Sequence, residues 1–293
     1  MPFFELTLQV AKHQAQDIDD TLTTSGAVGV TYVDGKDSPI YEPLPGEMPL
    51  WNHIKLIGLF DEQPKMVQAS ELLASQYPEL PQQKTQLKDQ VWERVWMDHF
   101  KPIRFGQNSW VIPVGYKVVN ENAINLILDP GLAFGTGTHE TTALCLRWLD
   151  AHDVRGLSLV DFGCGSGILA VMALLQGARK VICVDIDEQA IQATWQNAKK
   201  NGVESGIEVV NPENVDSINN QDGVLANILA EPLMMFCEKF NKMIKPGGFV
   251  VLSGILKTQK NMICEQYARH FVDISAEIDN DWVRVEGRKY SNS

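Results

Sequence analysis

Two hydrophobic periods share the first 90 residues of the chain, one typical of strands and one typical of helices. Four stretches have the short, largely apolar or alternating pattern of strands: residues 4–10, 28–33, 51–60 and 85–91. Two stretches have the longer spacing of helices: residues 14–25 and 67–77. The resulting order of strand, helix, strand, strand, helix, strand predicts a smaller α+β domain of the ferredoxin-like class over residues 1–90. Such domains often bind another protein, although the fold alone does not establish that use.

Apolar residues recur at helical spacing directly after this domain. Trp92, Val95, Trp96 and Phe100 occupy positions i, i+3, i+4 and i+8, the spacing of one helix face, before Pro102. The pattern predicts a helical linker over residues 91–103. Two interpretations stay open: a packed helix that joins two domains, or a hinge that carries the first domain over the active site of the second.

From residue 104 onward, apolar runs with the length of strands alternate with helical segments. The runs lie at residues 158–162, 180–185, 207–210, 223–227 and 248–253. This alternation predicts an α/β domain with a mostly parallel, doubly wound sheet, that is, a Rossmann-like domain over residues 104–293. Two last runs, 271–278 and 282–288, predict an antiparallel pair that closes a seven-stranded sheet.

The stretch LVDFGCGSGILA, residues 159–170, places three alternating glycines between an apolar run and a helical pattern. Glycines in such a turn let a ligand approach the backbone closely, and Gly163 and Gly165 are candidate contacts. Asp185 follows about 20 residues later at the end of the next strand, where a carboxylate can accept both ribose hydroxyls. The arrangement predicts a nucleoside cofactor, but it suits NAD and S-adenosyl-L-methionine equally.

Two polar residues at strand ends distinguish between these two possible cofactors. Asp161 precedes the first glycine, where a carboxylate would repel a pyrophosphate and hold the ammonium of a methionine moiety. Asn227 ends the apolar run VLAN, and its neutral amide can accept a hydrogen bond from an attacking amine. The alternative for Asn227 is a turn residue or helix cap. Together the two residues favour adenosyl-methionine over NAD.

A second glycine-rich stretch, residues 128–142, precedes a predicted helix. Phe134 is an aromatic residue within it, and Thr138 is placed to cap the helix that begins near His139. Ordering such a loop without a ligand is costly, so we expect it to fold over the cofactor with Phe134 as a contact. The alternative is a plain capped turn.

Composition narrows the class of partner. The net charge of −12 disfavours a nucleic-acid substrate and favours a basic partner. The five cysteines are scattered and form no C-x-x-C, as in reduced cytoplasmic proteins. We expect no metal site, because the histidines lack ligand spacing, and no membrane span or signal peptide, because no apolar run is long enough and no basic segment precedes one. We expect a monomer.

Five motifs taken together resemble the bacterial ribosomal protein methyltransferases that modify the stalk-base protein of the large subunit, large-subunit protein eleven. This family lies within the class I methyltransferase superfamily, and the resemblance spans nearly the whole chain. The motifs are WERVWMDHF (92–100), LDPGLAFGTGTH (128–139), DFGCGSG (161–167), VDID (184–187) and NILAEP (227–232). Glu140 and Glu188 stand where relatives often carry proline; both would open helices, where an acid is also favourable.

The resemblance implies S-adenosyl-L-methionine as cofactor, with contacts at Thr142, Gly163, Asp185 and Asn227. It further implies N-methylation, to the trimethyl state, of lysine side chains and the N-terminal amine of that ribosomal protein. The first domain would hold the substrate, and Asn227 would be the catalytic residue beside the amine. The alternatives are a class I N-methyltransferase for another protein or small-molecule amine, and an NAD-dependent oxidoreductase.

Overall fold

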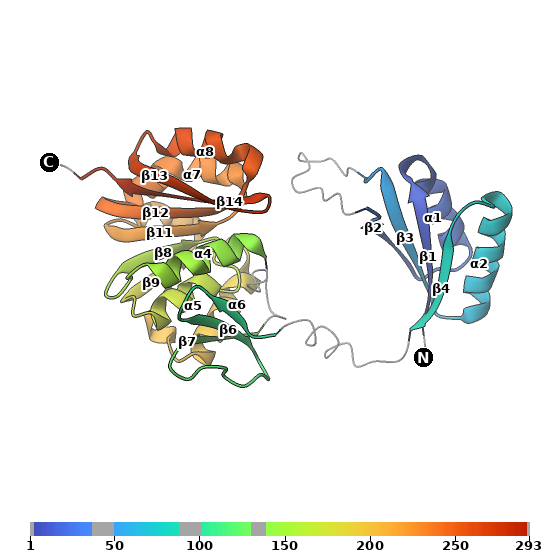
Figure 1. Ribbon diagram of the computed structural model, residues 1–293, viewed down its shortest axis with the longest axis horizontal. Coiled ribbons are helices and arrows are strands. Elements are labelled where there is room, and N and C mark those ends of the chain that lie inside the picture. The colour runs from blue at the N-terminus through green and yellow to red at the C-terminus, as the bar shows by residue number, and fades with distance from the viewer. Residues whose placement is uncertain (1–2, 37–49, 88–100, 130–138, 292–293) are drawn as a thin grey trace. The chain divides into compact units, whose positions relative to one another are not determined.

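The computed structural model describes residues 3–36, 50–87, 101–129 and 139–291. The chain divides into two compact units, Met1–Trp96 and Met97–Ser293, each with a sheet and helices of its own (Figure 1). Most of the predicted linker and the predicted contact Phe134 lie outside the described residues.

The first unit contains a four-stranded sheet in the order β2-β3-β1-β4, in which every neighbouring pair is antiparallel. Its strands are β1 (Phe3–Ala11), β2 (Gly29–Asp34), β3 (His53–Phe60) and β4 (Gln82–Leu87). Its helices are α1 (Ala15–Thr24) and α2 (Gln63–Gln76). The predicted order of elements along the chain is present. Two predicted starts were wrong. Helix α2 begins at Gln63, four residues before the predicted start, because Pro64 suits a first helical turn. Strand β4 begins at Gln82, three residues before the predicted start, because its first residues are polar and gave no apolar signal.

One face of this sheet carries the core of the unit. Leu6 and Leu8 of β1 and Leu56 of β3 are fully buried, in one cluster with side chains of both helices. Because strand residues alternate between faces, the helices α1 and α2 therefore cover the same face. The apolar residues of the alternating pattern that predicted these strands are therefore the residues that face this core.

The second unit contains a seven-stranded sheet in the order β10-β9-β8-β11-β12-β14-β13. The strands are β8 (Ser158–Phe162), β9 (Lys180–Val184), β10 (Ile207–Val209), β11 (Gln221–Asn227), β12 (Ile244–Leu256), β13 (Phe271–Asp279) and β14 (Trp282–Lys289). The first five are parallel, and β14 pairs antiparallel with both β12 and β13. The predicted Rossmann-like α/β unit with a mostly parallel sheet and a closing antiparallel pair is confirmed.

Helices cover both faces of this sheet (Figure 1). One face carries α4 (Glu140–Ala151), α5 (Ile168–Leu175) and α6 (Glu188–Lys200), and the other carries α7 (Ala230–Met243) and α8 (Lys260–Tyr267). Within β8, Leu159 packs with the first group while Val160 packs with the second. Burial on both faces explains why these strands are continuous apolar runs rather than alternating ones. Glu140 and Glu188 open α4 and α6, as predicted.

A small third sheet was not predicted. It consists of β5 (Ile103–Phe105), β6 (Ser109–Pro113) and β7 (Ile124–Leu128), and its apolar side chains join the core beside α4 and α5. A polar residue interrupts β5 (IRF) and β7 (INLIL), and β6 (SWVIP) has only three consecutive apolar residues before its proline, so the three strands give a weak apolar signal. In the part of the chain that the structure describes, no helix is long and apolar enough to cross a membrane.

Candidate active site

Three of the predicted site residues, Gly163, Asp185 and Asn227, lie at the carboxyl edge of the parallel strands. β8 lies between β9 and β11, so the ends of these three strands are neighbours. The amide of Gly163 donates to the carbonyl oxygen of Val184 at 2.7 Å, which joins the glycine turn to the end of β9. Asp185 and Asn227 lie at the ends of β9 and β11. Residues that are up to 64 positions apart in this sequence therefore share one edge, as parallel topology requires.

The glycine turn between β8 and α5 has backbone angles that favour glycine. Gly163, Gly165 and Gly167 have φ values of 77°, 54° and 75°, in the left-handed region. A Cβ on Gly163 would also lie 2.2 Å from Cγ2 of Ile228. Packing alone therefore requires glycine at this position, in addition to its predicted contact with the cofactor, which stays a prediction.

Asp185 is fixed over this turn by two backbone amides. Its Oδ2 accepts a hydrogen bond from Gly165 at 2.9 Å, and its Oδ1 accepts one from Asp187 at 3.0 Å. A carboxylate oxygen can accept more than one hydrogen bond, so this orientation leaves capacity for ribose hydroxyls. The next residue, Ile186, is 91% exposed, unusual for an isoleucine. We did not single it out from the sequence, although an apolar residue between two aspartates was the available signal.

Asn227 meets the first turn of α4. Its Nδ2 donates to Oγ1 of Thr142 at 3.2 Å, and Thr142 is 2% exposed. Ser253, paired with Asn227 in the register of β11 and β12, donates to the carbonyl oxygen of Thr141 at 2.9 Å. Two adjacent strand ends thus hold the same helical turn. The structure brings the predicted pair Thr142 and Asn227 together, and it adds Ser253, which we did not predict.

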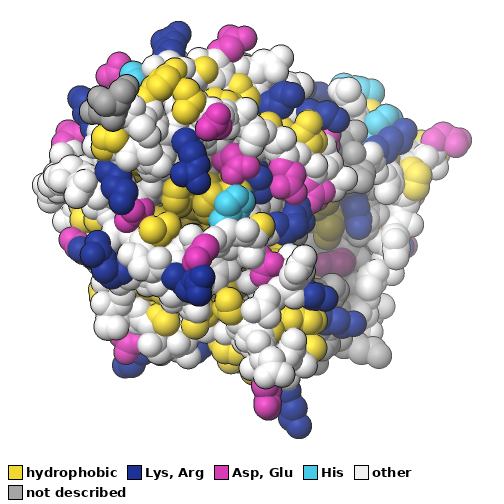
Figure 2. All heavy atoms as spheres, turned by 60° about the vertical axis from the view of Figure 1, so that its left-hand side comes forward, with side chains coloured by type: hydrophobic (Ala, Val, Ile, Leu, Met, Phe, Trp, Pro, Cys, Tyr) yellow, Lys and Arg dark blue, Asp and Glu magenta, His cyan; other side chains and the backbone are white. Residues whose placement is uncertain are grey.

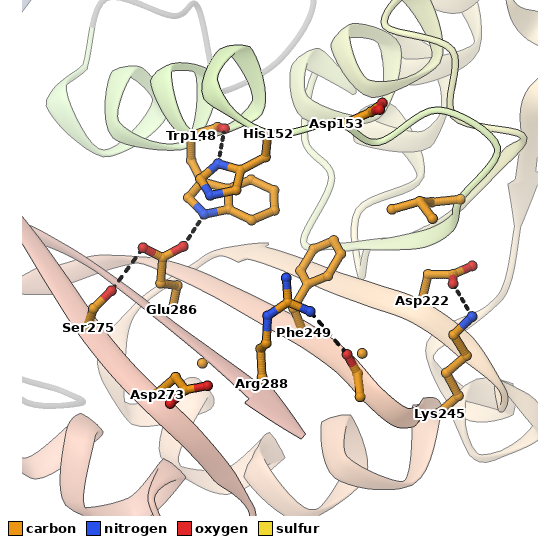
Figure 3. A pocket seen from close by; sticks show the side chains of 14 residues that line it. Trp148, His152, Asp153, Asp222, Lys245, Phe249, Asp273, Ser275, Glu286 and Arg288 are labelled. Carbon is orange, nitrogen blue, oxygen red and sulfur yellow. Dashed lines mark hydrogen bonds and ion pairs between the residues drawn. The ribbon is translucent and has the colours of Figure 1, made fainter. Parts of the chain in front are cut away.

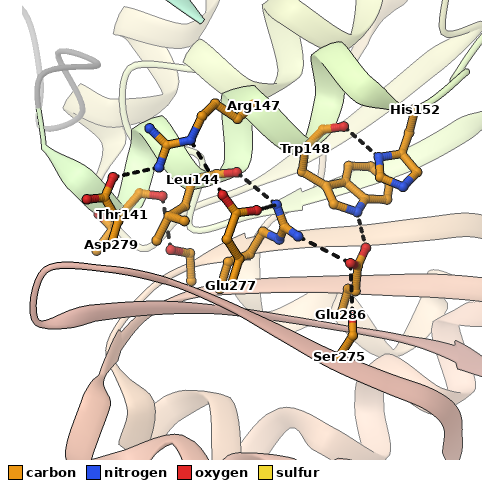
Figure 4. Close-up of polar contacts among 11 residues, drawn as sticks. Thr141, Leu144, Arg147, Trp148, His152, Ser275, Glu277, Asp279 and Glu286 are labelled. Carbon is orange, nitrogen blue, oxygen red and sulfur yellow. Dashed lines mark hydrogen bonds and ion pairs between the residues drawn. The ribbon is translucent and has the colours of Figure 1, made fainter. Parts of the chain in front are cut away.

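Charged groups hold the rest of α4 against the closing hairpin (Figure 4). Arg147 pairs with Asp279 at 2.6 Å. Arg284, which is nearly buried, pairs with Glu277 at 2.8 Å and donates to the carbonyl oxygen of Leu144 at 3.3 Å. These contacts fix the helix axis and hence the position of Thr142. The cap of α4 is the side chain of His139; the predicted cap, Thr138, lies outside the described residues.

Asp161 is 1% exposed at the end of β8. Its Oδ2 accepts a hydrogen bond from the amide of Ala170 at 3.0 Å. Burial raises the pKa of the Asp161 carboxyl to about 7; the Ala170 amide opposes that shift, and the charge of Asp185 adds to it. A cation beside a buried carboxyl relieves the cost of ionising it. The site therefore suits the ammonium that we predicted for it, and that contact stays a prediction.

A pocket of about 670 Å³ lies at the opposite end of the strands (Figure 3). Its lining includes Asp222 near the start of β11, and Trp148 and His152, whose rings stack at 4.2 Å, near the end of α4. It contains none of the predicted cofactor residues, so it is separate from the candidate site. Among the described residues, no three His, Cys, Asp or Glu side chains gather closely enough to hold a metal ion.

A doubly wound sheet with this strand order, a glycine turn after its first strand, an acid after the second and an amide after the fourth defines a class I methyltransferase. Residues 2–290 match the family described as ribosomal protein L11 methyltransferase (PrmA). The chain belongs to this family, and it is therefore an enzyme that transfers methyl groups from S-adenosyl-methionine. The NAD-dependent alternative is wrong.

Relatives of known name support the assignment over the full length. The chain is 45% identical over 293 residues to the ribosomal protein L11 methyltransferases of Escherichia fergusonii and Klebsiella pneumoniae, covering 99% of this chain and 100% of each relative. It is also similar to the crystal structure of ribosomal protein L11 methylase from Lactobacillus delbrueckii subsp. bulgaricus. That likeness has a TM-score of 0.60 and 29% identity, over 65% of this chain and 100% of the other.

The raised pKa of Asp161 makes a prediction about stability. Between about pH 4 and about pH 7 the folded carboxyl keeps its proton while the unfolded one ionises, so its contribution to the free energy of unfolding falls as pH rises. Asp161→Asn removes this titration. Without cofactor, urea unfolding should show the wild type losing up to about 4 kcal/mol relative to this variant across that window.

The control for this prediction is Asp273→Asn, which removes one charge at an exposed position where φ is 53° and asparagine is well tolerated. It should follow the wild-type pH dependence. Parallel curves for Asp161→Asn and the wild type would show that the carboxyl of Asp161 ionises normally in the folded protein.

Proposed function

We propose that this chain methylates lysine side chains and the N-terminal amine of ribosomal protein L11, to the trimethyl state. The observation that carries the proposal is the neutral amide of Asn227, held by Thr142 at the cofactor edge of the sheet. Full-length similarity to enzymes named for L11 supports this substrate. The similarity covers 100% of each of those relatives, so they share the first unit as well as the second.

The main task of the protein in this reaction is to orient the substrate amine toward the methyl group of the cofactor. When bound, the cofactor supplies a methyl group on a sulfonium; the amine lone pair forms the new C–N bond as the S–C bond breaks, and the amine proton passes to solvent. At pH 7, presenting a lysine as the neutral amine costs about 4–5 kcal/mol. A carboxylate touching that amine would raise its pKa and oppose the reaction. Because its Nδ2 is held by Thr142, Asn227 can offer its Oδ1 to the amine without adding a charge.

We infer the contacts of the cofactor from the same edge. Asp185 would accept the ribose hydroxyls, Asp161 would hold the methionine ammonium, and exposed Ile186 would lie against the adenine. Gly165 and Thr142 would border the ligand, together with Gly163. Phe134 remains an expectation from the sequence.

We infer that the first unit is a ferredoxin-like domain that holds the substrate, and its strand order β2-β3-β1-β4 supports that class. A net charge of −12 favours long-range attraction of a basic ribosomal protein. Figure 2 shows acidic and basic side chains interspersed on the face that it displays, so the excess is not concentrated there. We expect no nucleic-acid substrate and a monomeric enzyme.

A reducing compartment suits the cysteines, and we propose that the enzyme acts in the cytoplasm. All five cysteines are free, and four are buried. Burial raises the pKa of the Cys145 thiol to about 12 and that of Cys237 to about 11, so neither forms a reactive thiolate near neutral pH.

Asp185→Ala tests the ribose contact. It removes two charge-assisted hydrogen bonds to the ligand, and we expect the dissociation constant for adenosyl-methionine, measured by calorimetry, to rise at least about tenfold. Asp216→Ala, at an exposed carboxylate of the same unit, is the matched control and should bind normally. Unchanged affinity in Asp185→Ala would remove Asp185 from the ribose site.

Deletion of residues 1–90 tests the role of the first unit. Every residue proposed to contact the cofactor lies in the second unit, so the shortened enzyme should bind adenosyl-methionine as the full chain does. It should fail to methylate purified ribosomal protein L11, as followed by mass spectrometry. Methylation at the rate of the full chain would show that the first unit does not hold the substrate.

Two substitutions at Asn227 test the proposed function itself. Asn227→Asp is nearly isosteric, but its charge stabilises an ammonium, so methyl transfer should be much slower and the pH–rate profile should shift upward. Asn227→Ala should be slow through lost orientation, without the shift. Single-turnover rates on ribosomal protein L11 across a range of pH measure both effects. Wild-type rates and profiles in both variants would mean that Asn227 is only a turn residue.

A further inference from the structure

Asn197 is a fully buried amide on α6 that is hydrogen-bonded at both ends. Its Nδ2 donates to the carbonyl oxygen of Ser166 at 2.8 Å, inside the glycine turn. Its Oδ1 accepts a hydrogen bond from the amide of Asp129 at 3.2 Å, directly after β7. One side chain therefore joins two segments that are 37 residues apart in sequence.

Neighbouring residues of the same helix each reach only one of these segments. Thr194 donates to the carbonyl oxygen of Gly165 at 3.1 Å, within the turn. Lys200 pairs with Asp129 at 3.0 Å. Asn201, which follows α6, binds both the amide and the carbonyl of Ile127, each at 2.8 Å, as a neighbouring strand would. Of these four residues, only Asn197 connects the two sides.

The two points that Asn197 joins are the glycine turn, which borders the proposed cofactor site, and Asp129, which directly follows β7. The carbonyl oxygens of Gly165 and Ser166 both accept hydrogen bonds from α6, so this helix fixes the backbone of the glycine turn. The chain that leaves Asp129 returns at Thr141 and Thr142, where Ser253 and Asn227 hold it. The described residues on either side of this stretch are thus held by α6 at Asp129 and by the edge of the sheet at Thr141 and Thr142.

We propose that Asn197 is a positioning residue for cofactor binding: it fixes the glycine turn relative to Asp129 at the end of β7 before the ligand arrives. A site whose parts are already placed loses less conformational entropy on binding, so the connection contributes to affinity without touching the cofactor. Asn201 supplies the contrast, because it makes two hydrogen bonds to the same segment and none to the turn.

The test compares Asn197→Ala with Asn201→Ala in the full chain. Asn197→Ala loses two side-chain hydrogen bonds, and Asn201→Ala loses three, one of them to the carbonyl oxygen of Asn197, so both variants should unfold at lower temperature. Only Asn197→Ala should raise the dissociation constant for S-adenosyl-homocysteine, by about tenfold, while Asn201→Ala stays within about twofold of the wild type. At saturating adenosyl-methionine, Asn197→Ala should regain most of its single-turnover rate. Wild-type affinity in Asn197→Ala, or equal losses in both variants, would overturn the proposal.

Hydrogen exchange on the wild type gives a second measurement that needs no variant to fold. If the bonds of Asn197 strengthen cofactor binding, cofactor binding must stabilise those bonds by the same free energy. S-adenosyl-homocysteine should therefore slow exchange of the Asp129 amide more than that of the Ile127 amide. Equal changes at both amides would contradict the proposal.

The proposal rests on the cofactor site inferred above, which Asp185→Ala tests separately. Weakened binding in Asp185→Ala together with normal binding in Asn197→Ala would refute only the positioning role. Normal binding in both would show instead that the cofactor lies elsewhere.

Discussion

Ile228 packs tightly between Gly163 and Gly254, and this packing constrains the edge of the sheet that carries the candidate active site. A Cβ on Gly163 would lie 2.2 Å from Cγ2 of Ile228, and one on Gly254 would lie 2.2 Å from its carbonyl oxygen. Any side chain at either position would displace the chain directly after Asn227. Because Asn227 also binds Thr142, that displacement would reach the first turn of α4. The positions of the amide, the glycine turn and α4 therefore depend on one tightly packed crossing.

Local sequence signals predicted the frame of the site but not the contacts that hold it. Strand periods, the glycine turn and Asp185 depend on neighbours within about 25 residues, so the sequence displays them directly. Ser253 meets Thr141 across 112 residues, and Asn197 meets Asp129 across 68. In one sequence an Asn within a helix, or a Ser within an apolar strand, looks like a surface residue or an interruption. Only the folded chain shows that both are buried and bonded.

The misplaced start of β4 and the missed strands β5 to β7 also depend on contacts that are distant in the sequence. Polar β4 is a strand because β1 offers it a hydrogen-bonding edge, and the short strands β5 to β7 are held by the core that they help to cover. Tertiary pairing decides such segments, and their own side chains carry little period. The central strands β8, β9 and β11 carry apolar side chains toward both faces of the sheet, which is why they were found at nearly their true bounds.

The proposed contacts place opposite electrostatic demands on two strand ends of one sheet. The ammonium of the cofactor keeps its charge throughout the reaction, so a buried carboxyl such as Asp161 is a suitable partner, and the cation in turn favours ionisation of that carboxyl. The substrate amine must instead lose a proton before it can attack, so the group beside it must bind nitrogen without stabilising the charged form. Asn227 meets that requirement because an amide orients through its oxygen and carries no net charge. β8 and β11 are paired in the sheet with Asp161 opposite Leu225, two residues before Asn227, so the register holds the carboxyl and the amide at separate positions along the strands. In the proposed site, this register would keep the acid with the permanent cation and the amide with the transient one.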